Sequence, residues 1–131
     1  MDILSRLSQD HEELRALLAG IEAAAETQDS AALIARLDSS RAALTRDLDA
    51  HIDVEEAEAF DAIASALGDG LVAPFYEDHI EIKAARDVIY AELARGQTPY
   101  EAALRLCALI DSHQRREDLM LFPSARESAF S

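Results

Sequence analysis

The chain has 131 residues, of which 50% are hydrophobic, and a formal net charge of −14. This length fits a single domain with one hydrophobic core, and the excess of acidic groups would repel the phosphates of nucleic acids and anionic lipids, so we expect neither nucleic acid nor membrane as a partner. Because no apolar run approaches the roughly 20 residues of a membrane span, the N-terminus lacks the features of a signal peptide, and the lone Cys107 cannot form an internal disulfide, the sequence predicts a cytoplasmic protein.

The first half of the chain predicts two long helices. Its composition is rich in alanine, leucine, glutamate and arginine, with few β-branched residues and no tryptophan, which favours helix almost everywhere. The first helix is predicted over residues 2–26 and ends before a short polar stretch. Asp29 or Ser30 is positioned to cap the second helix, whose pattern continues over residues 30–67.

Glycine and proline residues delimit two further helices in the second half of the chain. Residues 68–70 read Gly-Asp-Gly and break the second helix, so the third is predicted over residues 71–95. Residues 98–101 combine a capping box with a proline at the first helical position, so the fourth helix is predicted to start there and to end at Pro123. Residues 124–131 are predicted to form a frayed tail.

Four helices joined by short connections favour an all-α fold, an antiparallel up-down-up-down four-helix bundle over residues 1–123. Apolar residues recur in each helix at spacings of three and four and mark the face that it buries. In the fourth helix this apolar stripe includes Met120. The chain has four histidines, and each of the four stripes contains one of them: His11, His51, His79 and His113.

Two glutamates lie on the same buried faces. Glu55 and Glu117 each follow a histidine of the stripe by four residues, which places them one helical turn further along. A buried carboxylate without a partner is costly, and buried charges are normally paired or bound to a metal. Lys83 and Arg86 are the only basic residues close to these stripes in register, too few to balance the set. The pattern therefore favours a metal site.

The histidines are predicted to meet at one level of the bundle. In an antiparallel hairpin, residues equidistant from the turn lie at the same height, and the midpoints between successive histidines fall at or near the predicted turns. The chain also repeats itself, because residues 10–14 resemble residues 78–82, and residues 51–60 resemble residues 113–122. Two similar hairpins about a pseudo-two-fold axis would each donate one lone histidine and one His-x-x-x-Glu pair.

The predicted ligand set is too large for one tetrahedral zinc ion. Imidazoles and carboxylates without a thiolate suit iron or manganese, and we favour iron over manganese and zinc. Two ions could each take two histidines, with the two glutamates bridging between them. Such a site would keep open coordination positions for a small molecule. The predicted ligands are His11, His51, Glu55, His79, His113 and Glu117.

At these residues the sequence resembles the hemerythrin HHE cation-binding domain family, from about residue 2 to residue 123. The family order H…HxxxE…H…HxxxE is present, and the segments HEELRALL and HQRREDLMLFP are also similar to the family. The resemblance implies a four-helix bundle with a non-haem di-iron centre. Oxygen-carrying members place their last carboxylate where Asp118 stands, but Glu117 is preferred here because it repeats the spacing of Glu55, whereas Asp118 lies about 100° round the helix.

The sequence departs from the oxygen carriers on the third helix. These carriers have an HxxxH pair there, whereas Phe75 and Lys83 stand four residues before and after His79. One iron would then lack a protein ligand, which argues against reversible oxygen carriage. Tyr76, three residues before His79, is a candidate substitute ligand or hydrogen-bond donor, or simply a packing residue.

The leading functional hypothesis is a di-iron protein that binds or reacts with oxygen, peroxide or nitric oxide, with peroxide consumption as the candidate enzymatic activity. Iron storage or sensing is an alternative. Repair of iron–sulfur clusters is another, since this ligand set also resembles that of di-iron repair proteins, although those carry an additional cysteine-bearing domain. A phosphotransfer bundle would need an exposed histidine, and a purely structural bundle leaves Glu55 and Glu117 unexplained.

Overall fold

The computed structural model describes residues 2–128, and every regular element within them is helical. The all-α prediction is therefore confirmed. Three elements, η1, η2 and η4, are π-helical turns, and η3 is a 3₁₀ turn. In chain order the elements are α1 (Ile3–Glu26), α2 (Ser30–Ser39), η1 (Ala43–Asp47), α3 (Leu48–Val54), η2 (Glu55–Phe60), α4 (Asp61–Leu67), η3 (Asp69–Leu71), α5 (Ala73–Ala94), α6 (Tyr100–Arg116), η4 (Glu117–Leu121) and α7 (Phe122–Ser128).

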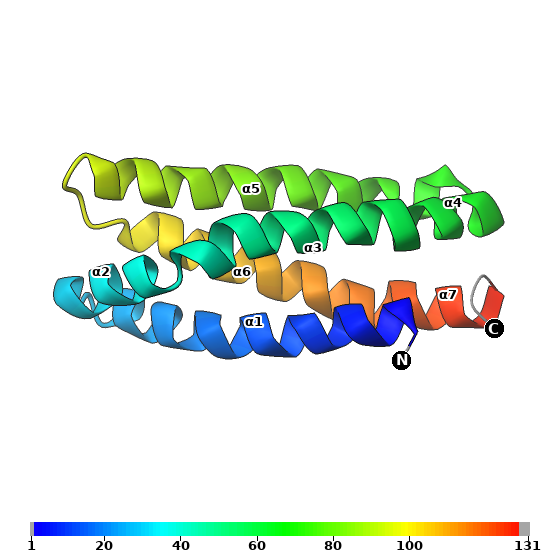
Figure 1. Cartoon of the computed structure of the whole chain (residues 1–131), viewed down its shortest axis with the longest axis horizontal. Coiled ribbons are helices and arrows are strands. Elements are labelled where there is room, and N and C mark those ends of the chain that lie inside the picture. Colours follow the sequence, from blue (N-terminus) through cyan, green and yellow to red (C-terminus); the bar gives the residue numbers. More distant parts are fainter. Residues whose placement is uncertain (1, 129–131) are drawn as a thin grey trace.

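These elements form an elongated molecule in which long helical segments lie side by side (Figure 1). The chain runs along α1, returns through α2, α3 and α4, runs back along α5 and returns through α6 and α7. The start of α1 and the end of α7 lie at the same end of the molecule (Figure 1). Within the described residues, no helix is both long enough and apolar enough to span a membrane.

Short polar side chains and glycines define the first helix ends. Asp2 accepts a hydrogen bond from the Ser5 amide at 2.8 Å, and Asp29 accepts one from the Ala32 amide at 3.1 Å, which satisfies donors that a helix N-terminus leaves free. Asp29 is thus the cap predicted for the second helix. After α4 the chain turns at Gly68 with a positive φ of 99°, a conformation that favours glycine.

The capping box predicted at residues 98–101 does not form. Pro99 precedes the first helical residue of α6, and no side chain caps this helix. The Thr98 hydroxyl instead shares a hydrogen bond of 2.8 Å with the Ser30 hydroxyl, so it joins the two connections at this end of the molecule. The capping-box pattern therefore predicted the start of this helix correctly, but it did not predict the hydrogen bond that Thr98 makes.

The predicted tail is also wrong over its first residues. The helix continues past Pro123 to Ser128, and Ala125 is fully buried. Proline lacks an amide donor and its ring crowds the preceding turn of a helix, but the Phe122 amide already bonds the Glu117 carbonyl five residues back, in a wide π turn. The ring therefore falls where the regular ladder is already interrupted. Residues 129–131 of the predicted tail lie outside the described residues.

The sequence predicts that Met120 is buried, and this prediction is wrong because of the same π turn. This side chain is 64% exposed, whereas Leu121 is 2% exposed. A π turn contains more residues than an α turn, so the buried face returns at the fourth residue after Glu117 rather than the third.

Two apolar clusters fill the interior on either side of the level of the histidines. One cluster contains Leu18, Leu37, Ile89 and Leu106, and the other contains Leu4, Phe60, Ile63, Phe122 and their neighbours. In each long helical segment the histidine lies between residues of the two clusters in sequence. The polar residues are therefore enclosed by apolar packing at both ends.

Candidate metal centre

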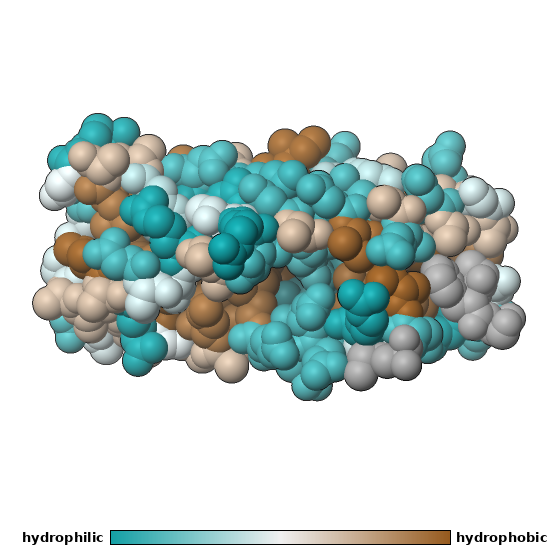
Figure 2. All heavy atoms as spheres, viewed as in Figure 1, coloured by the Kyte–Doolittle hydropathy of each residue, from teal (hydrophilic) through white to brown (hydrophobic). Residues whose placement is uncertain are grey.

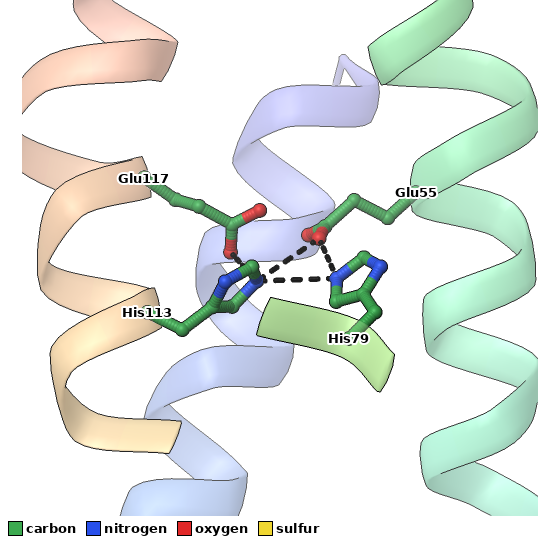
Figure 3. Close-up of side chains that lie close together, drawn as sticks. All are labelled: Glu55, His79, His113 and Glu117. Atoms are coloured by element: carbon green, nitrogen blue, oxygen red, sulfur yellow. Dashed lines mark hydrogen bonds and ion pairs between the residues drawn. The ribbon is translucent and has the colours of Figure 1, made fainter. Parts of the chain in front are cut away.

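The structure brings the six predicted ligands together in the interior. Glu55 and Glu117 are fully buried, the His11, His79 and His113 residues are at most 4% exposed, and the His51 side chain is 15% exposed. The residues project from different helical segments toward one space, as Figure 3 shows for Glu55, His79, His113 and Glu117. Burying so many polar groups costs free energy unless they are hydrogen-bonded, paired with opposite charges or bound to a metal.

Glu55 lies at the centre of the cluster and faces two histidine pairs with different oxygens. Its Oε1 atom lies 2.8 Å from His79 Nε2 and 3.4 Å from His113 Nε2. Its Oε2 atom lies 3.4 Å from His51 Nε2 and 3.7 Å from His11 Nε2. This single carboxylate therefore connects all four imidazoles.

Glu117 connects one histidine of each pair. Its Oε1 atom lies 3.1 Å from His113 Nε2 and 3.2 Å from His11 Nε2. The Nε2 atoms of His79 and His113 lie 3.1 Å apart (Figure 3). All four imidazoles thus direct Nε2 inward.

The Nδ1 atom of every histidine meets a carboxylate outside the cluster. His11 meets Asp118 at 3.1 Å and His79 meets Glu56 at 2.7 Å. Such bonds fix the tautomer with hydrogen on Nδ1 and leave the Nε2 lone pair free to bind a metal. The equivalent partners of His51 and His113 are Asp10 at 3.1 Å and Asp78 at 2.9 Å.

Sequence reasoning missed Asp10, Glu56 and Asp78 and considered Asp118 only as an alternative to Glu117, although the repeat contains all four. Asp10 and Asp78 immediately precede the lone histidines, while Glu56 and Asp118 immediately follow the two ligand glutamates. Each therefore serves a histidine of another helix, which a search for neighbours within one helix does not reveal. The acidic residue that recurs next to each lone histidine and each of the two glutamates was the sequence signal that could have revealed them.

The π turns that begin at the two glutamates bring a phenylalanine against each lone histidine. η2 starts at Glu55 and η4 at Glu117. Phe60, the last residue of η2, stacks on His79 with ring centroids 5.3 Å apart, and Phe122, which follows η4, stacks on His11 at 6.1 Å. The repeat thus places an acidic group and an aromatic ring on each lone imidazole.

The donor set fits metal ions. Among residues 2–128, His11 Nε2, Glu55 Oε2 and both carboxylate oxygens of Glu117 are buried without a hydrogen-bond partner. Two groups of ligand atoms are close enough to surround an ion, and they share Glu55. We call Glu55, His79, His113 and Glu117 the four-residue half-site, and His11, His51 and Glu55 the three-residue half-site.

The neighbouring carboxylates raise the pKa values of His11 and His113. Burial opposes protonation of His11, but the nearby carboxylates of Asp118, Glu117 and Glu55 outweigh the effect of burial and raise the pKa of His11 to about 11. Burial likewise opposes protonation of His113, and the two glutamates raise its pKa to about 10. The cluster thus favours positive charge at its centre.

The pKa values of the two glutamates move in opposite directions. Burial disfavours the charged form of Glu55, but the four histidines around its carboxylate hold its pKa well below the usual range. Burial and the negative charge of Glu55 raise the pKa of Glu117. Two carboxylates so close together need cations between them to remain ionised together.

The two remaining candidate residues lie beside the cluster. Asp118 is 25% exposed and binds His11 Nδ1 and the Ser8 hydroxyl, so it holds a histidine from outside. Tyr76 is half-buried and packs edge-on against Phe60, with ring centroids 5.1 Å apart. Its position matches the packing interpretation of this residue.

A groove of about 540 Å³ runs beside the three-residue half-site. Apolar side chains of α1 and α3, among them Leu14 and Leu48, line it together with His11 and His51. Figure 2, in which α1 and α3 face the viewer, shows apolar residues in the hollow between these helices. Of the two half-sites, this one alone contributes two histidines to the groove.

An all-helical domain with a buried histidine–glutamate cluster defines a cation-binding protein. The family model of the hemerythrin HHE cation-binding domain matches residues 2–125, so the chain belongs to this family. Comparisons with curated proteins and with solved structures give no match.

Proposed function

We propose that this chain is a di-iron protein that consumes peroxide, with its helices in the antiparallel four-helix arrangement predicted from the sequence. The observation that carries the proposal is the position of Glu55, which directs one oxygen to each histidine pair. A carboxylate shared in this way suits two ions better than one. Glu117 would serve as the second bridge, because its Oε1 faces a histidine of each pair.

Two bound iron ions would supply a redox-active, Lewis-acidic pair with an open coordination position. The chain itself orients the ligands, because each Nδ1 donates to an outer carboxylate and each Nε2 faces inward. The groove beside the three-residue half-site gives small molecules a path to this side of the centre. His11 and His51 line this groove, which supports placing the open position at the three-residue half-site.

Peroxide disproportionation fits this chain because it needs no further reactant. One hydrogen peroxide is oxidised to dioxygen and releases two electrons and two protons, and a second takes them up and is reduced to two waters. Superoxide or dioxygen reduction would instead require a separate electron donor. Iron is the metal proposed, since it can exchange these electrons, while zinc cannot.

Metal analysis and oxygen evolution test this proposal. Protein expressed with iron available should contain two irons per chain, show an ultraviolet–visible spectrum that changes on addition of peroxide, and evolve one dioxygen for every two peroxides consumed. Zinc-loaded protein is the matched control and should evolve none. One zinc and no iron in the iron-replete protein would contradict the site, and a long-lived oxygen complex would contradict the reaction.

A further inference from the structure

A small inner cavity lies between the histidines and the apolar cluster that contains Ile82 and Ile110. Its volume is about 20 Å³, enough for one water-sized group with some space to spare. The wall between this cavity and the groove includes His11, His51 and Gln114, which line both spaces. A small molecule in the groove is therefore one layer of side chains away from the cavity.

The sequence repeat governs the lining of this cavity. His11 and His79 occupy equivalent positions of the two repeats, as do His51 and His113, and all four line the cavity. The apolar lining residues are also equivalent in the repeat: Leu14 corresponds to Ile82, and Leu48 corresponds to Ile110. Equivalent residues of both repeats thus line the cavity.

One pair of residues breaks this symmetry. Ile52 follows His51 in the first repeat, and Gln114 follows His113 in the second. Both line the cavity, and they are 1% and 3% exposed. An amide thus stands where the symmetric counterpart is a buried aliphatic side chain.

The Gln114 amide lacks the partner that a structural role would provide. Within residues 2–128 its Oε1 atom is buried and accepts no hydrogen bond. Leaving a buried amide unpaired costs free energy, and an isoleucine such as Ile52 would avoid this cost. A polar residue in an otherwise apolar and imidazole-lined space indicates a ligand that pairs with it.

We propose that Gln114 binds hydrogen peroxide in the inner cavity. The inference rests on the function proposed above and names the residue that selects its substrate. An amide offers both an acceptor and donors, so its ligand must donate as well as accept. Hydrogen peroxide does both, is uncharged, and has two heavy atoms to suit the small volume. Nitric oxide and dioxygen have no hydrogen to donate and leave the Gln114 oxygen unpaired.

The Gln114→Ile variant tests the assignment, because it copies the residue of the other repeat. In iron-loaded protein we expect the KM for peroxide to rise roughly tenfold, as for one lost hydrogen bond, with kcat little changed. Nitric oxide affinity, measured by optical titration, should change less than about twofold, because this ligand makes no such bond. The metal-free variant should melt no lower than wild type, since an unpaired amide has been removed. Gln9→Ile, at an exposed position of α1, is the matched control.

A double variant keeps the composition of the cavity and moves the amide across it. Ile52→Gln combined with Gln114→Ile should recover peroxide binding toward the wild-type value, whereas a double variant as weak as Gln114→Ile contradicts the assignment. An unchanged KM for peroxide in Gln114→Ile would mean that the amide holds only water. An equal weakening of peroxide binding and nitric oxide binding would mean that the amide acts on the metal. Either result overturns the proposal. If the wild-type protein responds to neither molecule, the proposed function fails first.

Discussion

The two half-sites are built by the same repeat and yet differ in enclosure. In each, a lone histidine meets an acidic residue at Nδ1 and a stacked phenylalanine. However, the His51 side chain is 15% exposed, whereas its counterpart His113 is 5% exposed. The outer partner of His51, Asp10, is 54% exposed, and the partner of His113, Asp78, is 20% exposed.

This difference indicates that the repeat builds the cluster of histidines and glutamates. Residues that differ between the two repeats enclose one half-site more than the other. Arg116 donates to Asp78 at 2.7 Å and covers the four-residue half-site. The first repeat has Val54 at the corresponding place, which has neither the charge nor the length of an arginine, and here the groove opens instead. The four-residue half-site is thus suited to hold a metal firmly, and the three-residue half-site to admit a ligand.

The largest expected effect comes from the carboxylate that both half-sites share. Glu55→Gln should lose both metals at a concentration that saturates wild type, because an amide cannot offer a charged oxygen to each pair. Glu117→Gln should keep more metal than Glu55→Gln, because Glu55 still faces all four histidines. Metal per chain, measured after dialysis against equal free iron, checks the order. Equal retention in the two variants would show that Glu55 has no special role.

The sequence predicted contacts within one helix, but it did not predict the contacts between helices that the outer carboxylates make. The clustering of the six predicted ligands was identifiable because helical spacing places His51 near Glu55 and His113 near Glu117 within one helix. The outer carboxylates were not, because each contact joins two helices and depends on their rotation. The burial of Leu121 instead of Met120 was also missed, since a π turn has no strong sequence signal.

Metal removal should reveal unequal half-sites and a less stable fold. At free metal about 100-fold above each dissociation constant, binding to the native state alone stabilises by about 2.7 kcal/mol per site, so full chelation should lower the melting temperature by roughly 10–20 °C. Limited chelation should empty the three-residue half-site first, because it adjoins the groove and its His51 is more exposed than His113. Calorimetry during stepwise chelation checks both points. A single concerted loss of metal would contradict the difference between the half-sites.

The outer carboxylates allow each half-site to be weakened separately. Asp10→Ala removes the partner of His51, and Glu56→Ala removes the partner of His79. Each should lower metal affinity about 10- to 100-fold, mainly in its own half-site, because the imidazole loses its fixed orientation. Glu12→Ala, at an exposed position beside His11, is the control and should leave affinity unchanged. Metal titrations that show equal weakening of both half-sites by each variant would contradict this assignment.

Raising the pH should affect metal-free and metal-loaded protein in opposite ways. The pKa values of His11 and His113 rise from 6.5 to about 11 and about 10 in the metal-free fold, so their contribution to stability is complete below pH 6.5 and is lost as the pH approaches 10 to 11. Metal binding must displace these protons, so it should strengthen over the same interval. Urea unfolding with and without metal checks the two slopes. Metal-free protein that gains stability between pH 6.5 and 9 would contradict these protonation states.

The smallest expected effect is that of Tyr76→Phe, which tests whether this tyrosine completes either half-site. Tyr76 packs against Phe60, and burial raises the pKa of its phenol, so the neutral form is favoured over a metal-binding phenolate. The variant keeps the ring and its packing and removes only the hydroxyl, so the free energy of unfolding should change by less than about 0.5 kcal/mol. Iron content and the visible spectrum should stay as in wild type. Loss of a visible absorption band with both irons retained would instead identify Tyr76 as a metal ligand.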